Sequence, residues 1–149
     1  MKISIPHCLR LEHDELREHF KVLMREPGAI GKLSQEIAHQ MEPHFVKEES
    51  FALPPLSLLA SMARGEPVVD PEAVLEMTGK LRAELPVLLA EHKVFVQLLE
   101  KLLMITRETG HADYSDFVYN LILHAKIEEE VLYPAALLVG DFLRVREPA

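Results

Sequence analysis

The sequence predicts an all-α protein: one domain over residues 1–149, built as an up-down-up-down four-helix bundle with a short extra helix in the connector between helices 2 and 3. Three observations predict this fold. Long segments place apolar residues three and four positions apart, which is the period of an amphipathic helix. Pro and Gly separate these segments. No strand-like alternation occurs, and 149 residues with 48% apolar content are enough to bury one core.

The first two predicted helices form one half of the chain. The first covers residues 8–25 and ends at a Pro-Gly pair, and the second covers residues 30–51, where Pro43 predicts a local bend. The inward stripe of the first helix consists of Leu9, His13, Leu16, Phe20 and Leu23. Residues 52–70 connect the two halves and are apolar enough to hold a short helix over 56–63. This connector either caps the end of the bundle or forms a dimer contact.

The second half has the same organisation. The third predicted helix covers residues 71–109, because Asp70 before a Pro is a strong N-cap and Gly110 is a typical C-terminal stop. Pro86 lies inside this helix and predicts a kink. The fourth covers residues 113–143 and contains a second internal Pro, at which we expect a kink or a restart.

Charge and cysteine content exclude several classes of protein. The chain has 16 basic and 24 acidic residues, a net charge of −8, and no basic stripe. Binding to nucleic acid or to an anionic membrane surface is therefore not expected. Cys8 is the only cysteine, which excludes an intrachain disulfide and a thiolate cluster, and we interpret it as a small core residue. The sequence has neither a signal-peptide pattern nor a membrane span, so we expect a cytoplasmic protein.

A polar pattern occurs twice, about eighty residues apart. In each copy a His is followed by a Glu pair four and five residues later, and by a Pro ten residues later. The members are His44, Glu48 and Glu49 in the first copy, and His124, Glu128 and Glu129 in the second. A further His precedes each copy, His13 and His92. The two halves would then be related by a pseudo-twofold axis.

The surroundings of these residues point to metal binding. Each of the four histidines takes a Leu-like position in an apolar stripe, and a Glu four residues after a His faces the same side of the helix. Burying such groups unpaired is costly, and divalent cations would offset the cost. The candidate metal ligands are His13, His44, Glu48, His92, His124 and Glu128. Imidazole with carboxylate suits iron, manganese or zinc, and helical bundles are a known location for such sites.

Residues 9–139 resemble the hemerythrin-like proteins, also called HHE cation-binding domains. The matching segments are EHDEL with His13, HFVKEE at 44–49, AEHKVF with His92, and HAKIEEEVLYP at 124–134. The resemblance implies two iron ions (Fe2+ or Fe3+) in a non-haem centre, with an oxo or hydroxo bridge as an option and manganese or zinc as substitutes. It also implies that His13 and His44 bind one metal, that His92 and His124 bind the other, and that Glu48 and Glu128 bridge them.

The chain departs from the oxygen-carrying hemerythrins at two points. Those proteins have a second His four residues from the first on the third helix, where Leu88 and Val96 flank His92, and their last carboxylate is an Asp five residues after its His. His7 or His39 are candidates for the missing ligand. Fewer protein ligands leave open positions, so we expect binding of O2, NO or peroxide in sensing, scavenging or iron handling. The alternatives are a di-iron peroxidase or oxidase, and a metal-free interaction bundle with a vestigial site.

The neighbouring residues have secondary expectations. Glu49 and Glu129 are expected to be solvated or to hydrogen-bond a ligand side chain. Glu12 and Glu91 are expected to be surface charges, with a hydrogen bond to an imidazole N–H as the alternative. Tyr119 and Tyr133 are expected to be packing residues, with donation to a bound ligand as the alternative. A homodimer is a further expectation.

Overall fold

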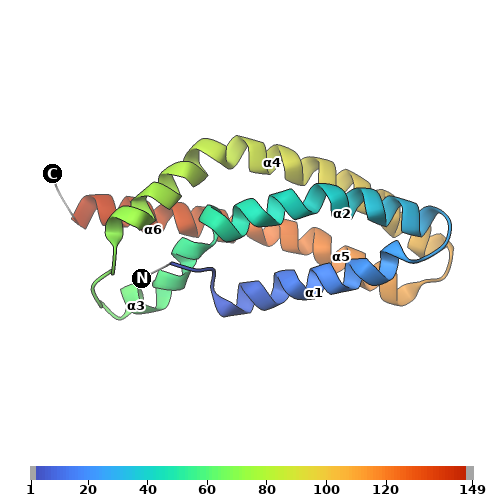
Figure 1. The fold of residues 1–149 in the computed structure, drawn as a ribbon, viewed down its shortest axis with the longest axis horizontal. Coiled ribbons are helices and arrows are strands. Elements are labelled where there is room, and N and C mark those ends of the chain that lie inside the picture. The colour runs from blue at the N-terminus through green and yellow to red at the C-terminus, as the bar shows by residue number, and fades with distance from the viewer. Residues whose placement is uncertain (1–2, 147–149) are drawn as a thin grey trace.

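The chain folds into helices. The structure, a computed structural model, describes residues 3–146, and these contain helices and turns but no strand, so the all-α class is confirmed. The long helices are α1 (His7–Met24), α2 (Ala29–Lys47), α4 (Pro71–Glu108), α5 (Ala112–Ile127) and α6 (Tyr133–Arg146). In Figure 1 α1, α2, α4 and α5 lie side by side, and α6 continues α5 end to end. α1 packs against α2, α2 against α4, α4 against both α5 and α6, and α1 against α5.

The helices begin and end near the capping residues and glycines predicted from the sequence. The Ala73 backbone N–H donates to Asp70 Oδ1 at 3.2 Å, so Asp70 caps α4 as expected. Gly28 and Gly110 have φ of 74° and 75°, a left-handed conformation that suits glycine and lets the chain leave the preceding helix. Pro86 lies inside α4, and Figure 1 shows that this helix is not straight.

Both Glu pairs lie in π-helical turns, which the sequence analysis did not predict. These turns are η1 (Glu48–Ala52), after α2, and η3 (Glu128–Leu132), between α5 and α6. The residue before each proline donates its N–H five residues back, from Leu53 to Glu48 and from Tyr133 to Glu128. A proline ring in a regular α-helix would clash with the carbonyl four residues earlier, and the wider turn avoids that clash.

The connector packs onto the bundle. It contains a 3-10 turn, η2 (Pro54–Leu58), and a short helix, α3 (Leu59–Ala63), so the expected extra helix is present. Leu53 and Leu56 are buried in the same apolar cluster as Leu81 and Leu88 of α4. The connector therefore closes one end of the core.

Two apolar layers enclose a polar one. The first layer lies towards the α1–α2 turn and includes Leu16, Phe20, Ile37, Phe45, Phe95, Leu99 and Leu121. The second lies towards the connector and includes Phe51, Leu53, Leu56, Leu81, Leu88 and Tyr133. Between these two layers lie one buried His from each of α1, α2, α4 and α5 and the first Glu of each π turn: His13, His44, Glu48, His92, His124 and Glu128. The fold thus holds six ionisable side chains between two apolar clusters.

Close packing of α4 against α6 predicts opposite effects for two Gly→Ala substitutions. A Cβ at Gly140 would lie 2.7 Å from Thr78 Cβ, whereas a Cβ at Gly79 would have no neighbour within 4 Å. We expect Gly140→Ala to cost about 1–3 kcal/mol through overpacking. Gly79→Ala should stabilise by about 0.5–1 kcal/mol, because Gly is unfavourable inside a helix. Urea unfolding of both variants checks this, and a stabilised Gly140→Ala would contradict the packing described.

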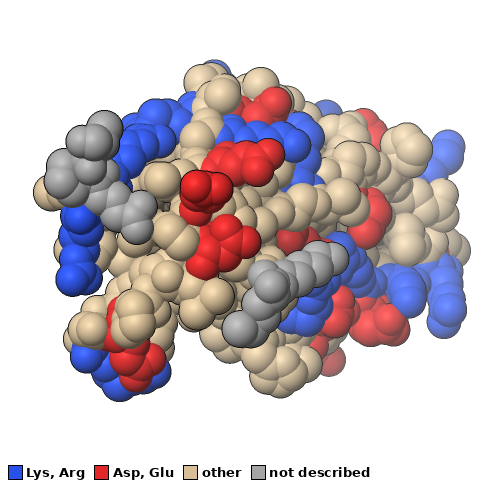
Figure 2. All heavy atoms as spheres, turned by 60° about the vertical axis from the view of Figure 1, so that its left-hand side comes forward, with Lys and Arg blue, Asp and Glu red and all other residues tan. Residues whose placement is uncertain are grey.

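The surface carries both signs of charge. In Figure 2 acidic side chains lie among basic ones near the centre of the face shown. Within residues 3–146, none of the helices is long and apolar enough to cross a membrane.

Candidate metal centre

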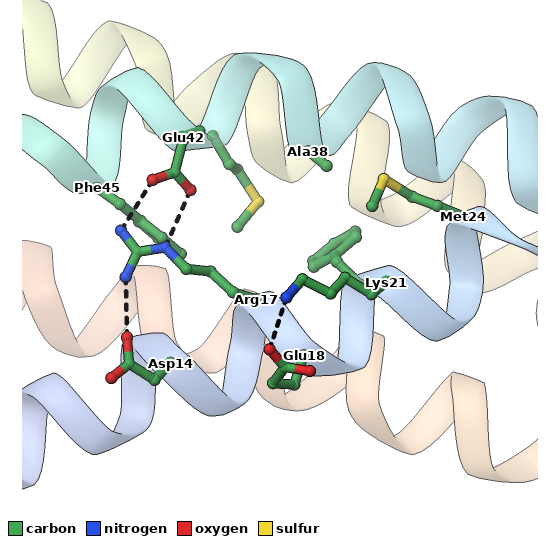
Figure 3. A pocket seen from close by; sticks show the side chains of 10 residues that line it. Asp14, Arg17, Glu18, Lys21, Met24, Ala38, Glu42 and Phe45 are labelled. Atoms are coloured by element: carbon green, nitrogen blue, oxygen red, sulfur yellow. Dashed lines mark hydrogen bonds and ion pairs between the residues drawn. The ribbon is translucent and has the colours of Figure 1, made fainter.

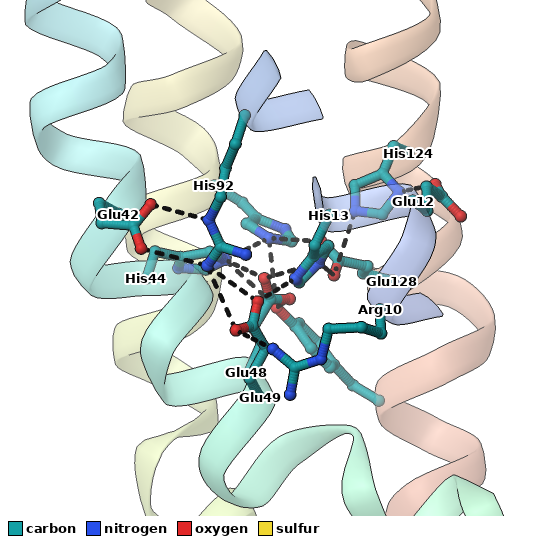
Figure 4. A network of polar contacts seen from close by, with 12 residues as sticks. Arg10, Glu12, His13, Glu42, His44, Glu48, Glu49, His92, His124 and Glu128 are labelled. Carbon is teal, nitrogen blue, oxygen red and sulfur yellow. Dashed lines mark hydrogen bonds and ion pairs between the residues drawn. The ribbon is translucent and has the colours of Figure 1, made fainter. Parts of the chain in front are cut away.

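All six residues predicted as metal ligands converge at one level of the helix assembly (Figure 4). α1, α2, α4 and α5 each contribute one His, and the two π turns each begin with a Glu. The side chains are almost completely buried, the most accessible being His124 at 6%. Burial at this level follows from the sequence, because each His continues the apolar stripe of its helix.

One group of four residues lies close enough to hold a metal ion. It consists of His44, Glu48, His92 and Glu128, whose ligand atoms lie within 4.8 Å of one another. The Nε2 atoms of His44 and His92 are 2.9 Å apart. Glu48 Oε1 lies 3.4 Å from His44 Nε2, and Glu128 Oε1 lies 3.3 Å from His92 Nε2. Ligands that bind one ion at about 2.0–2.2 Å have such separations.

The second group consists of His13, His124 and Glu128. Glu128 Oε2 lies 3.3 Å from His124 Nε2 and 3.8 Å from His13 Nε2. Glu128 thus offers one oxygen to each group, which is the arrangement of a bridging carboxylate. Glu48 belongs to the first group only, although its Oε1 is 3.7 Å from His13 Nε2.

The grouping differs from the pairing of histidines that the resemblance implies. His44 is grouped with His92, and His13 with His124, instead of His13 with His44 and His92 with His124. Helix contacts do not distinguish the two pairings, because α1 also packs against α2 and α4 against α5, so the grouping follows from distances between ligand atoms, such as 2.9 Å between the Nε2 atoms of His44 and His92.

Five buried side-chain atoms of the two groups have no hydrogen-bond partner within residues 3–146. Four are ligand atoms that face the centre, His13 Nε2, Glu48 Oε1, His124 Nε2 and Glu128 Oε2, and the fifth is His44 Nδ1. Each buried polar atom left unsatisfied costs about 1–3 kcal/mol, and more if it is charged. Lone pairs that face one another in an apolar core would be satisfied together by cations. The residues present therefore suit divalent metal ions.

A second ring of carboxylates surrounds the histidines, each on the ring nitrogen that faces away from the centre. Glu49 Oε2 lies 2.8 Å from His13 Nδ1, and Glu129 Oε1 lies 3.1 Å from His92 Nδ1. Glu12 contacts His124 Nδ1, and Glu91 Oε1 lies 3.5 Å from His44 Nδ1. In every pair the Glu comes from a neighbouring helix or turn. Glu49, Glu129 and Glu12 hydrogen-bond Nδ1 of their histidines, whereas Glu91 makes no hydrogen bond to His44. A carboxylate that accepts the Nδ1 proton leaves the Nε2 lone pair free for a metal.

The hydrogen bonds of this ring decide between the roles expected for its glutamates. Glu49 and Glu129 are expected to be solvated or to hydrogen-bond a ligand side chain, and both hydrogen-bond a ligand histidine. Glu12 takes the alternative role expected for it, because its partly exposed carboxylate hydrogen-bonds the His124 imidazole, and the partly exposed Glu91 pairs with Lys47 and lies 3.5 Å from His44 Nδ1. Glu12 directly precedes His13, and Glu91 directly precedes His92. One residue along an α-helix is a rotation of about 100°, so each Glu points away from that His and towards the neighbouring helix.

Basic residues outside the ring neutralise part of its charge. Glu49 pairs with Arg10 at 2.8 Å and with Arg17 at 2.9 Å, and Glu91 pairs with Lys47 at 2.8 Å. The cations lie on the solvent side of the carboxylates, so the buried face of each carboxylate remains turned to its His.

Tyr133 is buried in the second apolar layer, as expected of a packing residue, and it also reaches the first metal group. Its buried O–H donates to Glu48 Oε2 at 2.6 Å and lies 3.2 Å from His92 Nε2 and 3.4 Å from His44 Nε2. The π turn explains its position, because Tyr133 lies five residues after Glu128 and directly before Pro134. Tyr119, also expected to pack, is instead exposed.

Three other expectations are wrong. His7 and His39, the candidates for a missing ligand, are exposed and belong to neither group. His39 lies five residues before His44, which turns it about 140° away from the core. Cys8 is exposed rather than buried, because it lies one residue before the inward stripe that starts at Leu9.

Burial and hydrogen bonding set opposite pKa shifts in the two central carboxylates. Burial and the neighbouring Glu128 raise the pKa of Glu48 to about 7. Burial also opposes ionisation of Glu128, but the adjacent Glu48 and three nearby histidines outweigh it and hold the pKa of Glu128 well below its ordinary value. Burial disfavours charge on the imidazoles as well, yet the hydrogen-bonded Glu12 and the nearby Glu128 carboxylate raise the pKa of His124 to about 10.

These shifts predict proton release on metal binding. At pH 7 the metal-free protein holds His124 protonated, and only a neutral imidazole coordinates. Binding should therefore release at least one proton at pH 7, and affinity should rise with pH up to about 10. Calorimetric titration with Zn2+ in two buffers of different ionisation enthalpy measures the released protons. Equal heats in the two buffers, or tighter binding at pH 6 than at pH 8, would contradict the assignment of His124 as a ligand.

A pocket of about 420 Å³ lies beside the centre, between α1 and α2 (Figure 3). Arg17 borders it with Glu42 and lies over the Phe45 ring, 5.2 Å from its centroid. The other side of the same ring stacks on the His13 imidazole, with centroids 4.1 Å apart. One aromatic ring thus separates this pocket from a predicted metal ligand.

No family model, curated protein or solved structure matches this chain. The case for its function therefore depends on the residues and geometry described above.

Proposed function

We propose that this protein is a non-haem di-iron protein of the hemerythrin-like kind, with an up-down-up-down bundle, that binds a small ligand such as O2, NO or peroxide. The observation that carries the proposal is the set of four buried, unsatisfied ligand atoms that face one another at the centre of the helices. Two cations satisfy all of them. A metal-free bundle would leave them at a cost of several kcal/mol, which argues against a vestigial site.

The donor set favours iron with open positions. The first group offers two imidazoles and two carboxylates, and the second offers two imidazoles and one carboxylate. This nitrogen and oxygen set suits iron, and also manganese or zinc. Iron at such a centre supplies redox chemistry and positions for an exogenous ligand. The second group has only three ligands, so we expect the small ligand to bind there.

The chain's own residues prepare the site for that ligand. The carboxylates of Glu12, Glu49 and Glu129 orient the imidazoles through Nδ1. Phe45 and the second apolar layer exclude bulk water. Tyr133 holds a proton at its phenol oxygen. Burial raises the pKa of the phenol, so the proton stays on the oxygen.

Tyr133 also favours a second candidate, a di-iron peroxidase or oxidase. The buried Tyr133 O–H at 2.6 Å from Glu48 is a hydrogen-bond donor next to the site, and it would polarise a bound peroxide. Reduction of one H2O2 to two waters consumes two electrons from an external donor and two protons.

The test is a titration of iron-loaded protein with azide, followed by peroxide with an electron donor. Saturable azide binding without donor-dependent peroxide consumption supports the binding protein. Donor-dependent peroxide turnover that falls in Tyr133→Phe supports the enzyme. Absence of both, in protein that holds iron, would overturn the proposal of a ligand-accessible centre.

A further inference from the structure

The outward side of α5, η3 and α6 carries a line of exposed apolar side chains. Six large ones follow one another at intervals of mostly four residues: Tyr119, Leu123, Ile127, Val131, Leu138 and Phe142. Each is 43–64% exposed. Isolated exposed apolar residues are normal, but a continuous row marks a contact surface. We call this row the α5–α6 stripe.

The π turn keeps the stripe on one side of the helix. Residues four apart are rotated by about 40° in an α-helix, so the row drifts by about 120° from Tyr119 to Val131. η3 places one extra residue in the turn, which rotates the following residues back by about 100°. Leu138 and Phe142 therefore return to the side of Tyr119 and Leu123. The row then spans about 35 Å of helix.

The stripe is complementary to itself in the antiparallel direction. An acidic side chain, Asp116, precedes it, and a basic one, Arg146, follows it, both exposed. The Arg146 guanidinium lies over the Phe142 ring, 5.4 Å from its centroid, which places it on the stripe. Two copies related by a twofold axis near Glu130 would bring Asp116 of each copy opposite Arg146 of the other.

The same axis pairs the apolar residues. Tyr119 would face Phe142 of the second copy, and Leu123 would face Leu138 of the second copy. A parallel arrangement would instead place like charges together at both ends. Isologous twofold contacts of this kind are the commonest way in which identical chains associate.

We propose that the α5–α6 stripe is the interface of an antiparallel homodimer with its twofold axis near Glu130. The proposal does not depend on the metal centre. A contact along one helix of this length is at or below the roughly 1,200 Å² of a small stable interface. We therefore expect a dissociation constant in the micromolar range.

Sedimentation equilibrium of the full chain between about 1 and 300 µM tests the proposal. Leu138→Glu should weaken dimerisation at least tenfold, because it buries a charge in the stripe. Met104→Glu is the matched control: Met104 is 61% exposed on α4, Leu138 is 64% exposed, and the control should dimerise like the unmodified chain. Circular dichroism melting checks that both variants remain folded.

Charge reversal tests the antiparallel register. Asp116→Arg should weaken the dimer, and adding Arg146→Asp to the same chain should restore it, since each opposed pair regains unlike charges. A chain that stays monomeric at 300 µM overturns the proposal, as does a dimer that Leu138→Glu leaves intact. Binding of the stripe to phosphatidylcholine vesicles, lost in Leu138→Glu, without self-association would assign it to a lipid surface and also overturn the proposal.

Discussion

Glu128→Gln is expected to remove binding at both metal positions. Glu128 is the one residue that belongs to both groups, with Oε1 3.3 Å from His92 Nε2 and Oε2 3.3 Å from His124 Nε2. A glutamine keeps the size of the side chain but cannot bridge two cations as an anion. Loss of a residue that only hydrogen-bonds a metal ligand lowers metal affinity by roughly 10- to 100-fold. Because Glu128 is itself a ligand, we expect metal affinity at each position to fall by more than this.

Two matched variants make this result specific. Glu130→Gln removes an exposed carboxylate from the same π turn and should retain the metal content of the unmodified chain. Glu48→Gln should affect the first position more than the second, because Glu48 belongs to one group. Elemental analysis after dialysis against limiting iron measures all three. Full metal content in Glu128→Gln would show that Glu128 is not the bridging ligand.

His44→Leu is expected to lower the melting temperature of the metal-loaded protein and not that of the metal-free protein. A metal that binds only the folded state, present at a free concentration of about 1,000 times its dissociation constant, adds about 4 kcal/mol to the free energy of unfolding. Losing this contribution should lower the melting temperature of a chain of this size by roughly 10 °C. In metal-free protein the same change replaces a buried polar ring by an apolar side chain, so stability should be unchanged or higher.

The control for this variant lies on the same helix. His39→Leu removes an exposed imidazole from α2 and should leave both melting temperatures unchanged. Calorimetry with iron and with chelator separates the two states of each variant. If His44→Leu melts like the unmodified chain under both conditions, the buried histidines belong to a metal-free interaction bundle and the vestigial-site alternative holds.

The helices and the inward positions of the ligands could be predicted from the sequence. Periodicity identified the stripe of Leu9, His13, Leu16, Phe20 and Leu23, of which Leu9 is partly buried and the other four are buried. Asp70 and the glycines gave the ends of α4 and its neighbours because these residues act locally, through a cap or a positive φ. Each His continues an apolar stripe, so its burial follows from period alone.

Contacts between helices could not be predicted in this way. The roles of Glu12 and Glu91 depend on the imidazole of an adjacent helix, which no intrahelical spacing specifies. The grouping of His44 with His92 likewise depends on the 2.9 Å between Nε2 atoms of two different helices. A sequence signal for the π turns does exist, since a Pro follows each ligand Glu by six residues. The π turn before Pro134 also explains why Tyr133 points into the site.

The metal content of the chain tests the central claim most directly. Untagged protein is purified under anaerobic conditions, reconstituted with Fe2+, freed of excess metal and measured by elemental analysis. The two groups around Glu128 predict about two iron ions per chain, and the stoichiometry should be the same at all protein concentrations. Protein that remains folded and holds no metal after reconstitution with iron, manganese and zinc would contradict the account.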